Sequence, residues 1–398
     1  MRTQKLTLLV LGILVVFSTF SFTQTRETSA NTFSKDVAFL KKFTNIIVLE
    51  KEASKIAIAP DYEARVMTST DGNHLDYSYG YINYKFISEN RIVEGGNPYG
   101  GEDRLWLGPL GSKFTLFYNQ KPISEKNWHV PKAFDTSAYS LIKKTEGTAA
   151  FEKKITVQNN IGTAFLVGIT RNISLLDKQQ ISKELGFSIP QDVHFVGFQS
   201  SNTLRNKGEA WKKEAGLITP WVLGKFNGND KCVTFFPFKA SIKRPLVVKK
   251  YLNTIQNDRL RVLDSLIVFK TDGAYRSKIG LEKLNSKNSI GSYDDQNKVL
   301  TIIKFSFNPR GNYLSTTETD NPILFGGDVV SSYNNNTMNH LNSFYELEST
   351  SEALALETDS SVTHIHKTMH FMGSFEKLDS ISSTFFGHGL KKIKNSIR

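Results

Sequence analysis

The feature that most constrains the fold is a series of short runs rich in Val, Ile, Leu, Phe, Thr and Tyr, separated by clusters of Gly, Asn and Asp. Such runs are typical of β-strands, and the clusters between them are typical of turns. Helical patterns are confined to residues 34–42 and 177–184. The predicted strands are residues 46–49, 55–59, 113–118, 151–157, 164–173, 233–238, 260–270 and 299–307.

Strands that follow one another without intervening helices favour stacked antiparallel sheets over a parallel α/β fold. The chain has no Pro/Ser/Gly-rich linker and no repeat of 20–50 residues that would divide it. We therefore predict an all-β fold with one β-sandwich domain over residues 36–385. A loose segment at residues 25–35 precedes it, and a basic tail at residues 386–398 follows it.

The N-terminus has the pattern of a secretory signal. Arg2 and Lys5 precede an apolar run over residues 6–20, and a polar stretch follows the run. The run is shorter than the roughly 20 apolar residues of a membrane span, and no cysteine follows it for lipid attachment. We predict a signal peptide over residues 1–24, a periplasmic or secreted protein, and no stable membrane insertion after cleavage. The only cysteine, Cys232, cannot form an intramolecular disulfide.

The formal charge of +12 comes from lysines and arginines scattered along the chain. Scattered charge indicates a solvated surface and not a nucleic-acid interface, which needs a basic face. The sequence has no phosphate-binding loop, dinucleotide fingerprint, nucleophile elbow or zinc cysteine pattern. We expect neither a cofactor nor a metal.

The segment with the strongest functional pattern is residues 97–109. Gly100 and Gly101 let the backbone approach a ligand closely. Arg104 offers a fork of donors for vicinal hydroxyls or a carboxylate, and Trp106 can stack on a pyranose. We interpret Glu102, Asp103, Arg104 and Trp106 as ligand contacts. The alternative is a structural turn with an internal Asp/Arg ion pair.

A second candidate is residues 344–349. Alternate residues of a strand share a face, so Glu346 and Glu348 would lie together, roughly 7 Å apart, opposite Tyr345 and Leu347. If Tyr345 and Leu347 point between the sheets, both carboxylates point to the outer side. Two carboxylates on one face can divide acid–base roles. The alternative is an exposed acidic strand face.

Residues 362–371 place three histidines, His364, His366 and His370, on one strand face, with Met369 and Phe371 on the opposite, core-forming face. The histidines could bind a metal. We favour the interpretation in which they form a polar outer strand face.

Two further segments, residues 272–278 and 326–334, are either structural loops or ligand contacts through Arg276, Lys278, Asp328 and Tyr333.

In this order, these segments resemble a family of uncharacterised bacterial exported proteins related to galactose mutarotases and aldose 1-epimerases. The resemblance rests on residues 57–60, 65–69, 100–109, 272–280, 327–334, 344–349 and 364–366. It implies a galactose-mutarotase-like supersandwich of large antiparallel sheets with a sugar on one face.

In mutarotases a glutamate takes the proton of the anomeric hydroxyl and a histidine protonates the ring oxygen. Glu348 matches that glutamate best, with Glu346 as the alternative. Residues 97–99, Asn-Pro-Tyr, stand where mutarotases carry a histidine before the paired glycines. The resemblance therefore leaves the acid open, and the candidates are His74, His129, His364 and Tyr333.

We expect a mutarotase- or epimerase-like enzyme that acts on a mono- or oligosaccharide, with Glu348 or Glu346 as the base. The alternatives are a non-catalytic carbohydrate-binding or sensing protein, and a lyase or hydrolase on a related sandwich. The missing histidine favours the non-catalytic protein. The paired carboxylates and Arg104 favour the enzyme.

Overall fold

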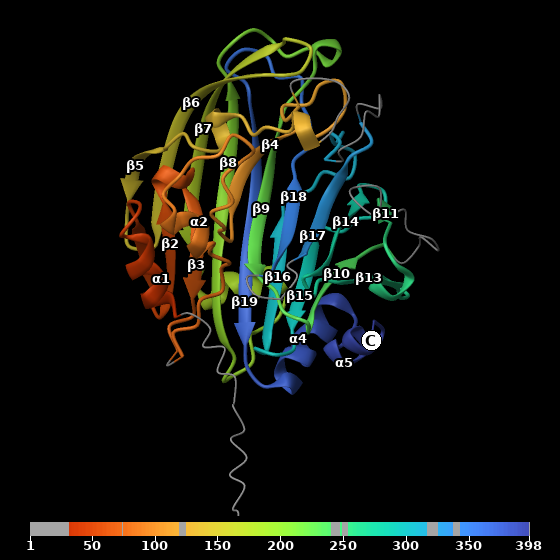
Figure 1. Ribbon diagram of the computed structural model, residues 1–398. Helices are drawn as coiled ribbons and strands as arrows, with labels where there is room; N and C mark the ends of the chain where they lie inside the picture. The colour runs from red at the N-terminus through yellow and green to blue at the C-terminus, as the bar shows by residue number, and fades with distance from the viewer. Residues whose placement is uncertain are drawn as a thin grey trace, which may run out of the picture. The chain divides into compact units, whose positions relative to one another are not determined.

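The computed structural model describes residues 32–73, 75–118, 125–239, 247–248, 254–316, 325–336 and 343–397. Its strands form three antiparallel sheets, of ten, six and three strands (Figure 1). The predicted all-β class is therefore confirmed. The predicted signal peptide and residues 25–31 lie outside the described residues.

The largest sheet begins at one edge with strands from the middle of the chain and ends at the other with β5. Its order is β12 (Leu260–Val262), β13 (Leu266–Lys270), β10 (Cys232–Pro237), β15 (Ser289–Asp294), β16 (Val299–Phe305), β19 (Ser361–Met372), β8 (His194–Asn206), β7 (Ala164–Leu175), β6 (Thr148–Gln158) and β5 (Ser140–Lys144). Figure 1 shows β6, β7 and β8 as long neighbouring strands.

The six-stranded sheet joins strands that are far apart in the sequence. Its order is β11 (Val247–Val248), β14 (Ala274–Glu282), β17 (Asp328–Asn336), β18 (Phe344–Thr350), β9 (Thr219–Asn227) and β4 (Arg104–Gly108). The third sheet is a local meander of β1 (Ile47–Lys51), β2 (Ser54–Ala59) and β3 (Arg65–Thr70).

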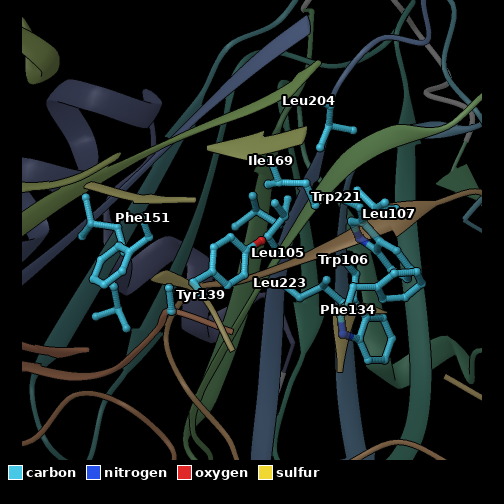
Figure 2. Close-up of a cluster of buried hydrophobic side chains, with 14 of the residues drawn as sticks. Leu105, Trp106, Leu107, Phe134, Tyr139, Phe151, Ile169, Leu204, Trp221 and Leu223 are labelled. Carbon is cyan, nitrogen blue, oxygen red and sulfur yellow. The ribbon is translucent and has the colours of Figure 1, made fainter. Parts of the chain in front are cut away.

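Two apolar cores hold the sheets together. In one, Ile279 and Leu347 of the six-stranded sheet pack with Ile267 and Ile303 of the ten-stranded sheet. The other includes side chains of all three sheets. Figure 2 shows part of it, with Leu105, Trp106 and Trp221 among the labelled side chains.

The helices are short. They are α1 (Phe33–Leu40), α2 (Tyr84–Ser88), α3 (Lys178–Leu185), α4 (Phe375–Phe386) and α5 (Leu390–Asn395). Helix α3 begins at a capping box formed by Asp177 and Gln180, which satisfies backbone donors of its first turn. The two predicted helices correspond to α1 and α3. Side chains of α3, α4 and α5 pack on the face of the ten-stranded sheet that carries Met369 and Phe371.

Residues 113–118, predicted as a strand, form no strand. The Thr115 hydroxyl donates to the Leu110 carbonyl at 2.5 Å and accepts from the Phe117 amide at 3.0 Å. These local side-chain bonds take the place of a ladder. Phe114 and Phe117 are nevertheless buried, which explains the apolar pattern.

Two other segments also differ from the prediction. Residues 33–35, predicted as part of a loose segment, form the first turn of α1 after the N-cap Thr32. Residues 386–398 were predicted as a basic tail, but they include α5, in which Leu390 and Ile393 are fully buried. The lysines lie between these apolar positions, so the helix is amphipathic and part of the domain.

Candidate functional site

The outer face of the six-stranded sheet carries a cluster of charged side chains. Tyr345 and Leu347 of β18 point into the core shared with the ten-stranded sheet. Because successive side chains of a strand alternate between faces, Glu346 and Glu348 point the other way. These two glutamates and the six side chains around them form what we call the outer-face cluster. Its members are Arg104, Trp106, Trp221, Lys225, Lys278, Ser331, Glu346 and Glu348.

Glu348 is held through one of its two oxygens. Its Oε2 accepts from Lys278 Nζ at 2.7 Å, from Trp221 Nε1 at 2.9 Å and from Ser331 Oγ at 3.0 Å. Ser331 lies directly opposite Glu348 in the β17–β18 ladder. Glu348 is fully buried, and its Oε1 has no hydrogen-bond partner among the described residues. That oxygen is an unused acceptor, which costs free energy unless a donor reaches it.

Glu346 is paired with two cations at the same oxygen. Arg104 Nη2 donates to Glu346 Oε1 at 3.3 Å, and Lys225 Nζ lies 3.3 Å from that atom. Lys225 faces Glu346 directly across the β9–β18 ladder, and Arg104 comes from β4 on the far side of β9. Three strands from distant parts of the chain therefore bring these charges together.

Two tryptophans connect the two glutamates. The Arg104 guanidinium lies over the Trp106 ring at 4.1 Å, and Trp106 meets Trp221 edge to face at 5.9 Å. Trp221 in turn donates to Glu348. Arg104, Trp106 and Glu348 thus belong to one set of contacts. Arg104 covers one face of the Trp106 ring, so that face is closed to a sugar.

The environments of the two glutamates push their pKa values apart. Burial raises the pKa of Glu346, but Lys225, Arg104 and Lys278 outweigh burial and lower it overall. Burial raises the pKa of Glu348, which has one close cation and the negative Glu346 nearby. Paired groups with opposite shifts are common where acid and base roles are divided.

The cluster reaches the surface at its rim. Arg104, Lys225, Lys278 and Glu346 each keep 5–6% of their surface exposed, and Trp106 keeps 7%. Next to the rim, Arg276 Nε donates to the Tyr333 hydroxyl at 3.1 Å. Tyr333 of β17 lies opposite Glu346 in the β17–β18 ladder and opposite Lys278 in the β14–β17 ladder.

Asp328 lies at the start of β17 and is buried. Its Oδ1 accepts from the Thr316 hydroxyl at 2.5 Å, and its Oδ2 has no partner among the described residues. A side chain at Gly280 would collide with this carboxylate, so glycine is required beside it. The negative charge of Asp328 contributes to the raised pKa of Glu348, which indicates that Asp328 is within electrostatic reach of the cluster.

Glu102 and Asp103 do not join this cluster. Glu102 Oε2 accepts from the Ser69 hydroxyl and contacts His370 Nε2, both at 2.9 Å. Asp103 accepts from Arg171 and Ser200, both at 2.6 Å. Both carboxylates are fully buried. Gly100 and Gly101 have φ near +100°, and β4 begins at Arg104. Arg104 contacts Glu346, so the three charged side chains have three different sets of partners.

The histidines of β19 lie inside the sandwich. Val362 and Met372 share their strand face and belong to the core between the sheets. The Ser349 hydroxyl is 2.7 Å from both His364 Nε2 and His366 Nδ1. Burial lowers the pKa of His364 to about 3 and that of His366 to about 4. The predicted polar outer face is therefore wrong.

No described group of three or more histidine, cysteine, aspartate or glutamate side chains could hold a metal. His129 lines a separate cavity of about 490 Å³ with Thr115, Tyr118, Lys132 and residues of the β6–β7 turn, and no residue of the outer-face cluster lines it. His74 lies outside the described residues. Of the three candidate acids that the structure describes, Tyr333 is the one at the rim of the cluster.

Sequence reasoning did not identify Trp221, Lys225 and Ser331. The available signal was Lys225 itself, because a lysine inside the buried strand β9 needs a partner charge. Naming that partner requires the β9–β18 register, which the local sequence does not contain.

The fold and the cluster define an all-β protein of large antiparallel sheets with a buried charged site on the outer face of the smaller one. The chain belongs to a family of unknown function, DUF6786, whose match covers residues 31–397. The expected uncharacterised family is therefore confirmed. No curated protein matches the sequence.

Several solved structures are similar to this chain. The Slr1438 protein from Synechocystis sp. PCC 6803 has a TM-score of 0.51 at 10% identity, over 83% of this chain and 96% of that one. A galactose mutarotase related enzyme from Lactobacillus acidophilus has a TM-score of 0.49 at 12% identity, over 83% and 98%. A galactose mutarotase-like protein from Lactobacillus casei has a TM-score of 0.45 at 11% identity, over 82% and 100%. At 10% identity and a TM-score of 0.51, the similarity to the Slr1438 protein concerns the fold alone.

Within the described part of the chain, none of the helices is both long enough and apolar enough to span a membrane.

Proposed function

We propose that this chain is an exported, carbohydrate-active isomerase of the aldose 1-epimerase type, with Glu348 as its general base. The observation that carries the proposal is the state of Glu348, which is fixed through Oε2 by three donors while Oε1 has none. A fixed carboxylate with a free lone pair and a raised pKa is suited to accept a proton from a sugar hydroxyl. Export rests on the N-terminal sequence alone.

The chemistry requires two proton transfers. Glu348 takes the proton of the anomeric hydroxyl, and the released electron pair forms the carbonyl at the anomeric carbon. The bond from that carbon to the ring oxygen breaks, and the ring oxygen takes a proton from an acid. After the aldehyde rotates, the reverse steps close the ring on its other face. The acid and the base must therefore lie on opposite edges of one sugar.

The other members of the site have supporting roles in this proposal. Lys278 positions Glu348 at 2.7 Å, and Arg104, held over Trp106, offers donors to sugar hydroxyls. Glu346 keeps Arg104 and Lys225 in place and is the alternative base. We assign Arg276, Asp328 and Tyr333 to the sugar-binding rim. Glu102 and Asp103, held by Ser69, His370, Arg171 and Ser200, are not part of the proposed site.

Anomer exchange by NMR on a panel of aldoses tests the proposal, with wild type compared with Glu348→Gln. The variant keeps the size of the side chain but removes the base, so we expect the exchange rate to fall about 10²- to 10⁴-fold. Glu357→Gln, which changes an exposed glutamate outside the cluster, is the matched control and is expected to retain the wild-type rate. An unchanged rate in Glu348→Gln would refute the assignment of the base.

A second candidate is a non-catalytic carbohydrate-binding protein. It is favoured by one observation, that no described histidine belongs to the outer-face cluster, although the resemblance implies a histidine acid. Binding of an aldose without acceleration of anomer exchange on any sugar of the panel would establish this candidate and exclude the isomerase.

A further inference from the structure

Lys225 occupies an unusual position for a lysine. It lies in β9 between Gly224 and Phe226, and only 5% of its surface is exposed. Its ammonium lies 4.3 Å from the centre of the Phe344 ring and 3.3 Å from Glu346 Oε1. Lysine is almost never fully buried unless it is paired, so this placement needs a reason.

The charges that face Lys225 come from three other strands. Glu346 of β18 stabilises its charged form, whereas Arg104 of β4 and Arg65 of β3 disfavour it. Burial is the largest effect, and together these groups lower the pKa of Lys225 to about 8. The Lys225 ammonium is therefore a stronger acid than an ordinary lysine near neutral pH.

If Lys225 loses its proton, the Glu346 carboxylate still has a cationic partner. Arg104 donates to the same oxygen of Glu346, at the same 3.3 Å, and a guanidinium does not deprotonate in proteins. Lys278 differs, because its described carboxylate partner is Glu348, the proposed base. Among the described cations of the cluster, Lys225 is thus the one that can lose a proton while its carboxylate stays paired.

Lys225 also lies at a suitable distance from the base. In the β9–β18 ladder Glu346 is opposite Lys225 and Glu348 is opposite Leu223, so Lys225 and Glu348 are diagonal neighbours. Diagonal pairs across an antiparallel ladder are roughly 7–8 Å apart. With that separation, the long side chains of Lys225 and Glu348 can each reach a different edge of one sugar ring.

We propose that Lys225 is the general acid of the site and gives its proton to the ring oxygen as Glu348 takes the proton of the anomeric hydroxyl. This assignment rests on the proposed function. In the opening step the ring oxygen receives the electron pair of the broken bond and the Lys225 proton, which leaves a neutral amine. In the closing step the amine takes the proton back from that hydroxyl, so no further reactant is needed.

The test is the pH dependence of anomer exchange in the folded chain. In wild type the rate falls about tenfold per pH unit above about pH 8, because the ammonium is lost. Lys225→Arg keeps the charge but does not titrate in this range, so the fall near pH 8 disappears. Lys225→Met removes the acid and lowers the rate about 10²- to 10⁴-fold at pH 7. A purely structural lysine would not move the pH profile.

Lys153→Met is the matched control. Lys153 is half-buried, its pKa is also lowered to about 8, and it donates to the carbonyls of Ala133 and Ser137. The control keeps the wild-type fall near pH 8. NMR titration of labelled lysines, with each variant identifying its own signal, checks the pKa of Lys225 independently of activity.

Three results would overturn the assignment. Exchange that persists in Lys225→Met, or a fall near pH 8 that persists in Lys225→Arg, removes Lys225 as the acid and leaves the Glu348 proposal intact. Absence of exchange on every sugar removes both proposals, even if Lys225 titrates near pH 8.

Discussion

The ion pair of Asp103 and Arg171 lies in the interior of this sandwich, where an unpaired charge would be strongly destabilising. Both side chains are fully buried, and their atoms lie 2.6 Å apart. Ser200 donates to the other oxygen of Asp103, and Asn202 accepts from Arg171 at 2.8 Å. Burial of this pair is tolerated because each charged group finds hydrogen-bond partners on neighbouring strands.

We predict that Asp103→Asn lowers the free energy of unfolding by about 3–5 kcal/mol, because it leaves the Arg171 charge buried without a counter-ion. Denaturant unfolding monitored by circular dichroism measures the change. The control is Asp359→Asn, which breaks the exposed pair with Lys207 and is expected to cost less than about 1 kcal/mol. Equal losses in the two variants would contradict the role given to the buried pair.

Individual residues of the site were predictable to different degrees. Glu346 and Glu348 could be placed on one outer face because the alternation within β18 is a local property. Arg104 could be recognised as a candidate site residue because its guanidinium offers a fork of donors. Asp103 could not be separated from Arg104, because the sequence does not show that the strand begins between them. Lys225 is defined as a site residue only by its partner, which lies 121 positions further along the chain (346 − 225 = 121).

Among the elements, strands with local alternation were predicted best. Each of β6 and β7 alternates buried and exposed or half-buried residues along most of its length, and both coincide with predicted strands. Residues 113–118 were predicted wrongly because a buried loop can be as apolar as a strand. Helix α5 was interpreted as a tail because its lysines dominate its composition, while its apolar face is only a few residues wide.

Helix α5 gives a test at the scale of the element. Leu390 is fully buried against the ten-stranded sheet together with Ile393. We predict that Leu390→Ala lowers the free energy of unfolding by about 2–5 kcal/mol, because it leaves a cavity under the helix. Lys391→Ala changes the next residue, which is exposed, and is expected to have little effect. Thermal unfolding of the two variants measures the difference, and a tail that contributes nothing to the fold would show none.

At the scale of the whole molecule, the site depends on long-range pairing. β4, β9 and β18 are separated by more than a hundred residues, yet they are neighbours in the six-stranded sheet. The repeated strand pattern predicts that sheets form but does not predict which strands pair. The sheet order therefore had to come from the three-dimensional structure, and the resemblance could supply only the general architecture.

The buried histidines make the stability of the whole molecule depend on pH. His364 and His366 are enclosed between the sheets, and the pKa values of about 3 and about 4 lie below the ordinary value of 6.5. Below pH 6.5 the unfolded chain binds protons at these residues and the folded chain does not. Stability is therefore complete above about pH 6.5 and decreases as the pH falls toward 4, by about 1.4 kcal/mol per pH unit for each histidine.

We predict that the double variant His364→Gln/His366→Gln is less stable at pH 7.5 but loses less stability than wild type between pH 6.5 and pH 4.5. Its pH slope is reduced because the two groups that resist protonation in the folded state are gone. Denaturant unfolding at a series of pH values measures both slopes. His194→Gln, at an exposed position of β8, is the control and keeps the wild-type slope. If the double variant keeps that slope as well, protonation of other groups governs acid unfolding, and the Ser349-linked histidines contribute to the core only through packing and hydrogen bonding.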